Sequence, residues 1–379
     1  MTSTFARSAA WALVGIAGCG GTGPVASSAA CGGQSADALW VASDYSSSSV
    51  GGLSLALGVL SDASGVDLGA DPALAISRGR AFFVARDQSA IIEIDPHCGT
   101  PVSRVDVPAP PGAFGALDPQ DVGVARDGSL WVPLFDVPAL VVMGDNGELT
   151  RTIDLSGYDG DGNPNASSVA MVDTALGEKA FVVLERLDDS DGYAADQAAW
   201  MLRIDVATAF VEGTVVLAGR NPFGLMVAEG GVLWLADPGS WSDANEANAG
   251  IERFDPATST SQLVVTESDL GASVAEVAVS GSCGVAIVAD ASAANATSLV
   301  TVDVASGAIQ TSVANSPLST AGYDLEGLEI VGNVVMVGDR RRAADGYPVH
   351  LFNMDDSCQL SPVDPVMISQ PPVALRQVR

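Results

Sequence analysis

Residues 121–155 read DVGVARDGSLWVPLFDVPALVVMGDNGELTRTIDL, and this stretch decides the fold. It holds four short apolar runs, with Asp127-Gly128 between the first two and Asn146-Gly147 between the last two. Asp-Gly and Asn-Gly pairs between apolar runs are strong signals for tight hairpins. We therefore interpret the stretch as one four-stranded antiparallel unit, with strands at 121–125, 129–134, 139–143 and 148–155.

The second strand of this unit belongs to a phrase that occurs seven times in the chain. The phrase is apolar-aromatic-apolar-small or a close variant, and it is found at 39–42, 82–85, 130–133, 181–184, 233–236, 286–289 and 335–338. Counted from the second residue of each copy, except the fourth, where Phe181 fits best, successive copies are 43, 48, 50, 53, 53 and 49 residues apart. A period near 50 with several short strands per unit is typical of propellers. The sequence thus predicts an all-β fold, a seven-bladed β-propeller of four-stranded antiparallel blades.

The first unit lacks a first strand, because Leu39 follows a Gly-, Ser- and Ala-rich segment directly. After the seventh unit, residues 372–378 still read PVALRQV, which suits a strand. We expect this segment to supply the missing inner strand, so that the ring is closed by pairing of the N- and C-terminal segments. Such closure removes exposed sheet edges.

The N-terminal residues have the features of an export signal. Arg7 precedes an apolar stretch at 8–18 that is too short to span a bilayer. The stretch ends in Ile16-Ala17-Gly18-Cys19, which resembles the bacterial lipobox. The resemblance implies a lipoprotein signal peptide at 1–18 and acylation of Cys19, for example by palmitate. An ordinary signal peptide with a chance cysteine is the alternative.

Residues 19–37 have no apolar period and are interpreted as a lipidated flexible tether, which leaves 38–379 for the propeller. By analogy with enteric bacteria, Gly20 in place of Asp after the lipidated cysteine indicates the outer membrane. The expected location is therefore the cell envelope, with membrane contact through the lipid anchor only.

The chain has 17 basic and 46 acidic residues and a net charge of −29. This charge argues against nucleic acid and against an anionic membrane surface as partners. It is explained either by solubility of an exported protein or by cation binding.

Four cysteines remain in the exported domain, and two disulfides are expected in an oxidising compartment. In the repeat alignment, Cys283 and Cys358 occupy turns on the same face of adjacent blades, and Cys31 and Cys98 have the same relation. We therefore predict the pairs Cys31–Cys98 and Cys283–Cys358.

Several units resemble the YVTN/YncE-type propeller repeats of secreted bacterial lipoproteins. The resemblance is carried by Asn221-Pro222-Phe223-Gly224, Leu233-Trp234-Leu235-Ala236 and Phe254-Asp255-Pro256-Ala257-Thr258. It covers about residues 38 to 379 and implies architecture rather than activity.

The inner strands offer the most interesting polar residues. The equivalent positions near their starts are Ala73, Asp121, Ser168, Phe223, Glu276 and Glu326. Carboxylates that converge on an axis repel one another unless water, protons or a cation separates them, and oxygen ligands suit Ca²⁺. The arrangement resembles the SMP-30/gluconolactonase propellers, and that resemblance implies an axial metal near Glu326, Asn221 and Asp121. A hydrated acidic funnel without metal is the alternative.

A second candidate calcium site is Asp159, Asp161 and Asn163, whose oxygens alternate as at the start of a calcium loop. Position twelve of that loop is Ala170, so it is not an EF-hand, and an Asp-Gly turn is the alternative. The acidic insertion at 187–196 is expected on the same face. Trp241 lies in another insertion, where it is free to touch a ligand.

The sequence favours a binding or scaffolding module for an envelope protein or a small ligand, without catalysis. The alternative is a calcium-dependent lactonase-type hydrolase that uses the axial acids. Assistance in the assembly of envelope proteins is a third possibility that no residue selects.

Overall fold

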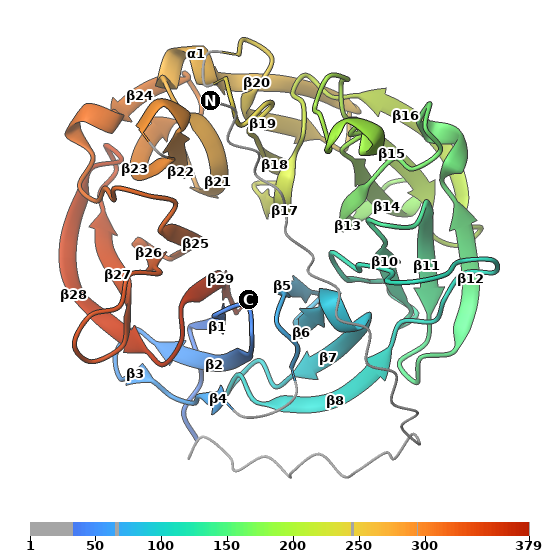
Figure 1. Cartoon of the computed structure of the whole chain (residues 1–379), viewed down its shortest axis with the longest axis horizontal. Helices are drawn as coiled ribbons and strands as arrows, with labels where there is room; N and C mark the ends of the chain where they lie inside the picture. Colours follow the sequence, from blue (N-terminus) through green and yellow to red (C-terminus); the bar gives the residue numbers. More distant parts are fainter. Residues whose placement is uncertain (1–32, 65–67, 244–245, 294, 379) are drawn as a thin grey trace.

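The structure, a computed structural model, describes residues 33–64, 68–243, 246–293 and 295–378. Seven antiparallel sheets follow one another around a central axis, as Figure 1 shows. The predicted seven-bladed all-β propeller is therefore confirmed. The predicted signal peptide, Cys19 and residues 20–32 of the tether lie outside the described residues. Within the described ranges, no helix is long and apolar enough to cross a membrane.

In each blade, the strands are named from the innermost outward. Blade 1 contains β29 (Pro372–Gln377), β1 (Ala38–Ser43), β2 (Ser48–Ser54), β3 (Gly58–Val59) and β4 (Ala63–Ser64). Blade 2 contains β5 (Pro72–Ser77), β6 (Arg80–Ala85), β7 (Ala90–Ile94) and β8 (Pro101–Asp106). Blade 3 contains β9 (Gly123–Val124), β10 (Leu130–Pro133), β11 (Ala139–Met143) and β12 (Leu149–Asp154). Blade 4 contains β13 (Ala166–Thr174), β14 (Gly177–Leu184), β15 (Trp200–Asp205) and β16 (Phe210–Val216).

The remaining three blades have the same order. Blade 5 contains β17 (Phe223–Glu229), β18 (Val232–Asp237), β19 (Gly250–Asp255) and β20 (Thr260–Thr266). Blade 6 contains β21 (Ser273–Ser280), β22 (Cys283–Asp290), β23 (Ala296–Asp303) and β24 (Ala308–Thr311). Blade 7 contains β25 (Leu325–Val331), β26 (Val334–Asp339), β27 (Tyr347–Met354) and β28 (Leu360–Ile368). A short helix, α1 (Glu267–Leu270), connects blades 5 and 6.

The recurring phrase forms the second strand of every blade, and its apolar residues pack in two directions. Successive side chains of a strand point to opposite faces. In β6, Phe82 therefore packs in a cluster with blade 3, and Phe83 packs in a cluster with blade 1. Each of the seven apolar clusters joins two neighbouring blades. The core is thus a ring of interblade layers, which explains why a chain of this length needs no single large core.

The predicted closure of the ring is confirmed. β29 pairs antiparallel with β1, with Trp40 opposite Leu375 and Leu39 opposite Arg376. Figure 1 shows β29 beside β1 and close to β25, so the pairing joins distant parts of the sequence.

Blade 3 departs from its prediction at the inner strand. The predicted strand 121–125 is reduced to β9, only Gly123–Val124. The Val122 amide donates to the Asp121 side chain over 2.7 Å, so it does not join the ladder with β10.

The predicted disulfide Cys283–Cys358 is present and joins blades 6 and 7, with 5.4 Å between the two Cα atoms. The other predicted pair, Cys31–Cys98, includes a residue outside the described ranges and stays a prediction.

Candidate functional site

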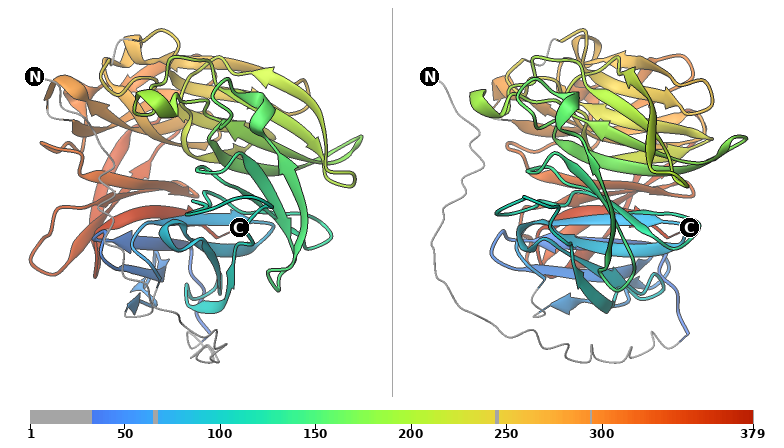
Figure 2. Two further views of the ribbon diagram at one scale, coloured as in Figure 1. Left: turned by 45° about the vertical axis from the view of Figure 1, so that its right-hand side comes forward. Right: turned by 90° about the vertical axis from the view of Figure 1, so that its right-hand side faces the viewer.

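The connections between strands differ strongly on the two faces of the ring. Because the strands alternate in direction, connections after the first and third strands of a blade lie on one face, which we call the turn face. Connections after the second and fourth strands lie on the other, which we call the loop face. Several turn-face connections have two residues, such as 78–79 and 230–231. The loop face carries the long segments 107–122, 185–199, 238–249 and 312–324. The side views of Figure 2 show connections projecting from these opposite faces.

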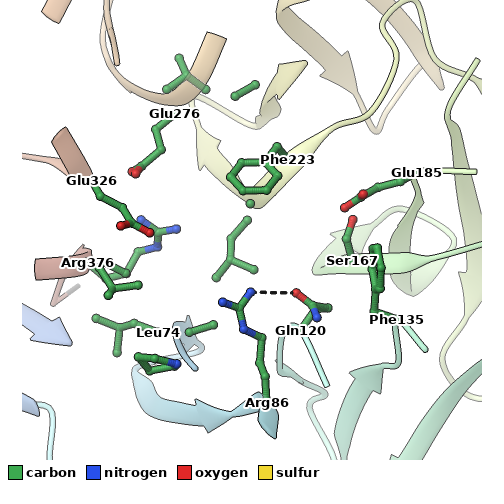
Figure 3. A pocket seen from close by; sticks show the side chains of 18 residues that line it. Leu74, Arg86, Gln120, Phe135, Ser167, Glu185, Phe223, Glu276, Glu326 and Arg376 are labelled. Atoms are coloured by element: carbon green, nitrogen blue, oxygen red, sulfur yellow. Dashed lines mark hydrogen bonds between the residues drawn. The ribbon is translucent and has the colours of Figure 1, made fainter. Parts of the chain in front are cut away.

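A cavity of about 120 Å³ lies at the axis, lined mainly by inner strands and loop-face segments of all seven blades. We call it the axial pocket. Its charged and polar lining side chains are Arg86, Gln120, Ser167, Glu185, Glu276, Glu326 and Arg376, and Phe135 and Phe223 contribute aromatic rings. Figure 3 shows Arg86 and Arg376 directed into the pocket together with the carboxylates. The pocket is therefore of mixed charge rather than purely acidic.

The structure brings only two of the four predicted axial residues into this pocket. Glu276 and Glu326 line it, whereas Asp121 and Asn221 do not. Asn221 Nδ2 donates to the carbonyl of Gly239 over 2.8 Å within blade 5. Among the described residues, no three His, Cys, Asp or Glu side chains form a group that could hold a metal ion. The four side chains thus do not meet around one point.

The acidic residues at the inner strands have a structural role that the sequence did not reveal. Each innermost strand has an edge without a neighbouring strand, and its free amides need acceptors. A polar side chain from the preceding blade accepts a hydrogen bond from these amides. The pairs are Ser77 with Val124, Asp121 with Val169, Ser168 with Met226, Glu276 with Leu328, and Glu329 with Gln377. Asp121 and Glu276 therefore occupy their positions because they bridge adjacent blades.

Burial at the axis changes the protonation of two carboxyl groups. Desolvation raises the pKa of Glu276 to about 7, and the nearby Glu326 adds to the shift. Desolvation also raises the pKa of Glu326, although the Arg340 guanidinium opposes that shift. Near neutral pH, Glu276 exchanges a proton at the wall of the pocket.

Arg340 joins the pocket to the closure of the ring. Its guanidinium donates to Glu326 over 2.8 Å, to the carbonyl of Pro372 over 3.0 Å and to the carbonyl of Ser43 over 3.2 Å. It also lies over the ring of Tyr45, 4.7 Å from the centroid. One side chain of blade 7 thus binds both strands that close blade 1.

Sequence reasoning missed the basic residues of the pocket, and one of them had a detectable signal. Arg86 and Arg340 each follow a second strand, and their amides bond equivalent carbonyls, those of Asp71 and Asp324. The repeat alignment equates Asp71 with Asp324, which is the detectable signal, and it places Arg340 one residue later than Arg86 relative to the repeated phrase. Arg376 lies in β29, and only the pairing of β29 with β1 shows which of its side chains point to the axis.

The predicted calcium loop contacts the acidic insertion of blade 4, as expected for two segments of one face. Asn163 Nδ2 donates to Asp189 over 3.0 Å, and the Asp189 amide donates to Asp161 over 3.3 Å. Asp159 lies 3.6 Å from Arg186, at ion-pair distance. Protein donors thus contact Asp159 and Asp161, whereas the Asn163 side chain is itself a donor, and the calcium at this loop stays a prediction.

Trp241 is not as free as the sequence indicated. Its ring packs edge-on between Phe223, 5.3 Å away, and Tyr323, 6.0 Å away, measured between centroids. Since Phe223 lines the axial pocket, this aromatic stack supports the pocket wall.

Comparison with solved structures supports the architecture. A protein from Lactobacillus plantarum matches with a TM-score of 0.56 and 16% identity, covering 90% of this chain and 99% of the other. A "putative 6-phosphogluconolactonase" from Bacteroides fragilis matches with a TM-score of 0.56 and 14% identity, covering 90% and 98%. The WD40 repeats of RRP9 match with a TM-score of 0.53 and 11% identity, covering 81% and 84%. The chain is a WD40-like seven-bladed propeller.

These identities are low enough that the likeness concerns the fold alone. No protein-family model matches the chain. No curated protein matches it either.

Proposed function

We propose that this propeller is a non-catalytic binding module of the cell envelope whose binding surface is the loop face, including the axial pocket. The observation that carries the proposal is the concentration of long connections, aromatic side chains and the pocket on one face. In repeat proteins, insertions on one face commonly form the binding surface. The resemblance to YVTN/YncE-type repeats supports an envelope role.

Membrane attachment belongs to the same proposal. Acylation of Cys19 would place the propeller at a membrane, and Gly20 supports the outer membrane. Mass spectrometry of the N-terminal peptide should detect acyl chains on Cys19, and Cys19→Ser should release the protein into the soluble fraction. An unmodified Cys19 would contradict this part of the proposal.

The geometry supports binding better than hydrolysis. A lactonase-type centre would need Asp121, Asn221, Glu276 and Glu326 to share one ion. Asp121 instead bonds Ser168 and Val169 of the next blade, and Asn221 bonds Gly239. These side chains already act in holding the fold together.

Two exposed apolar side chains on opposite faces provide a matched test. Phe114 lies in the loop-face segment 107–122 and is 94% exposed, while Leu176 lies in a turn-face connection and is 83% exposed. Full-length protein should be used to capture a partner from envelope extract, with Phe114→Ser and Leu176→Ser compared with the wild type. We expect Phe114→Ser to reduce capture at least about fivefold and Leu176→Ser to leave it unchanged. Equal capture by both variants, or loss only with Leu176→Ser, would contradict the loop-face assignment.

A further inference from the structure

The geometry points to a small organic acid as the ligand of the axial pocket, with its carboxylate bound by the guanidinium of Arg376 and the rest of the molecule against the apolar wall. This inference rests on the proposed function, because it takes the axial pocket as part of the binding surface. It names the chemical class of the ligand and the residue that selects it.

Arg376 is directed into the pocket from β29, the strand that closes the ring. It interacts electrostatically with Asp121 of blade 3 and with Glu276 of blade 6, which lie on different sides of the ring. The guanidinium therefore lies near the axis. Among the described residues, no carboxylate comes within 4.0 Å of it, in contrast to most arginines of this chain. Within the described ranges, the one hydrogen bond of the Arg376 side chain is donated by Nη1 to the carbonyl of Leu375 over 2.8 Å.

A guanidinium has five N–H donors in a planar fork that matches the two oxygens of a carboxylate. With one donor used, Arg376 has the remaining donors for a ligand or for water. Carboxylates are bound well by such a fork because two parallel, charge-assisted hydrogen bonds form at once. This geometry selects an anionic oxygen group rather than an amine.

Arg86 provides a second, fixed positive charge at the pocket. Its Nη1 donates to Gln120 over 3.1 Å, as Figure 3 shows, and its Nη2 pairs with Asp71. These bonds hold the side chain in place, and its Nε is buried without a hydrogen-bond partner among the described residues. Arg86 thus places a fixed guanidinium at the pocket, with a charge that Asp71 partly offsets.

Two of the three carboxylates that line the pocket oppose an anion less than their charge suggests. Glu326 is paired with Arg340, and Glu276 accepts hydrogen bonds from the amides of Gly327 and Leu328. The titratable and charged groups that interact with Glu276 are Glu326 from β25, Arg376 from β29 and Tyr323 from the segment 312–324. Burial raises the pKa of Glu276 to about 7. A bound anion nearby would favour the neutral form of Glu276, so that anion binding would be coupled to uptake of a proton by Glu276. Anion affinity should therefore fall as the pH rises through 7.

Much of the remaining wall is apolar, which favours a ligand with a hydrocarbon part. Leu74, Leu225, Val277 and Phe223 line the pocket between the charged groups. A compact acid places its carboxylate at Arg376 and its hydrocarbon against these side chains.

Three probes of similar shape test the inference on the full-length protein: benzoate, benzamide and benzylamine. Their dissociation constants are to be measured by NMR titration at pH 6, 7 and 8. We expect benzoate to bind at least about tenfold more tightly than the other two, and its affinity to fall from pH 6 to pH 8. Tighter binding of benzylamine, or equal binding of benzoate and benzamide, would overturn the inference.

Arginine variants identify the residue responsible. Arg376→Gln should weaken benzoate at least about tenfold, while Arg151→Gln, the same charge change at an exposed position of β12, should not. If Arg376→Gln does not fold, Arg376→Lys keeps the charge but removes the fork, and a several-fold loss is expected. Unchanged benzoate affinity in a folded Arg376 variant would overturn the inference.

The two proposals fail separately. If no probe binds but partner capture still depends on Phe114, the organic-acid inference is wrong and the loop-face function stands. If benzoate binds through Arg376 but no Phe114-dependent capture occurs, the site is supported and the protein-binding part of the proposed function is wrong.

Discussion

Most paired arginines of this propeller are more exposed on the turn face than on the loop face, although loop-face Arg341 is 48% exposed and the turn-face Lys179 is only 4% exposed. On the turn face, partly exposed pairs link strands and blades, as in Arg78 with Asp173 and Glu178, and Arg126 with Asp173. On the loop face, Arg86, Arg186, Arg220 and Arg340 have side chains only 12 to 20% exposed, each paired with an acid beneath or within the loops. The difference shows that buried ion pairs hold several loops of the loop face in place.

The largest expected effect comes from removing β29, the strand that closes the ring and runs between the two faces. Deletion of residues 370–379 removes β29 and exposes the edge of β1. Because the ring then cannot close, we expect loss of the cooperative thermal transition, followed by circular dichroism and calorimetry. A variant with a native-like Tm would mean that each face is stable without closure.

The second prediction concerns pH, which should act on the two faces in opposite directions. Burial raises the pKa of Glu267, on the loop face, to about 8, and Asp237, fully buried beneath it, also has its pKa raised well above normal by burial. On the turn face, the Lys179 ammonium lowers the pKa of Asp205 to about 2.

A raised carboxyl pKa means that the folded state holds a proton that the unfolded state has lost, so stability falls as the pH rises from about 4.5 to 8. A lowered pKa has the reverse effect, so the contribution of Asp205 is present above about pH 4 and is lost as the pH falls toward 2. We expect the Tm to be highest near pH 4 to 5 and to fall on both sides. Glu267→Gln should flatten only the alkaline side, and an unchanged alkaline slope would contradict the assignment.

The smallest expected effect compares one arginine from each face. Arg340→Met removes a largely buried guanidinium that bonds Glu326 and both closing strands, and breaking such a pair costs about 3 kcal/mol. Arg126→Gln removes a pair whose arginine side chain is 63% exposed, which costs under about 1 kcal/mol. Urea denaturation of both variants measures the difference. Equal losses would show that the two faces do not differ in how their arginines act.

The repeat made most of the fold predictable from the sequence. The phrase that includes Trp131 recurs because each blade packs on two neighbours, and this constraint sets the apolar pattern in every unit. The same alignment placed residues 372–378 in blade 1 and paired Cys283 with Cys358, and both predictions are confirmed.

The site was less predictable, since its residues depend on which side chains meet rather than on local pattern. Glu276 and Glu326 were placed at the axis, but their partners are amides of Gly327 and Leu328 and the side chain of Arg340, and no local pattern shows these contacts. Arg376 faces the axis only because of the register of β29 on β1. Where a loop lies across a blade is likewise set by single contacts, such as Asn163 with Asp189.

Closure of blade 1 by β29 also determines when the domain becomes complete. During synthesis, β1 emerges early, yet its inner partner follows more than 300 residues later. Until residues 372–377 have emerged, the edge of β1 is open to any other strand, including one from a second chain. Until its last strand has been made, the unfinished ring is therefore open to edge-to-edge pairing.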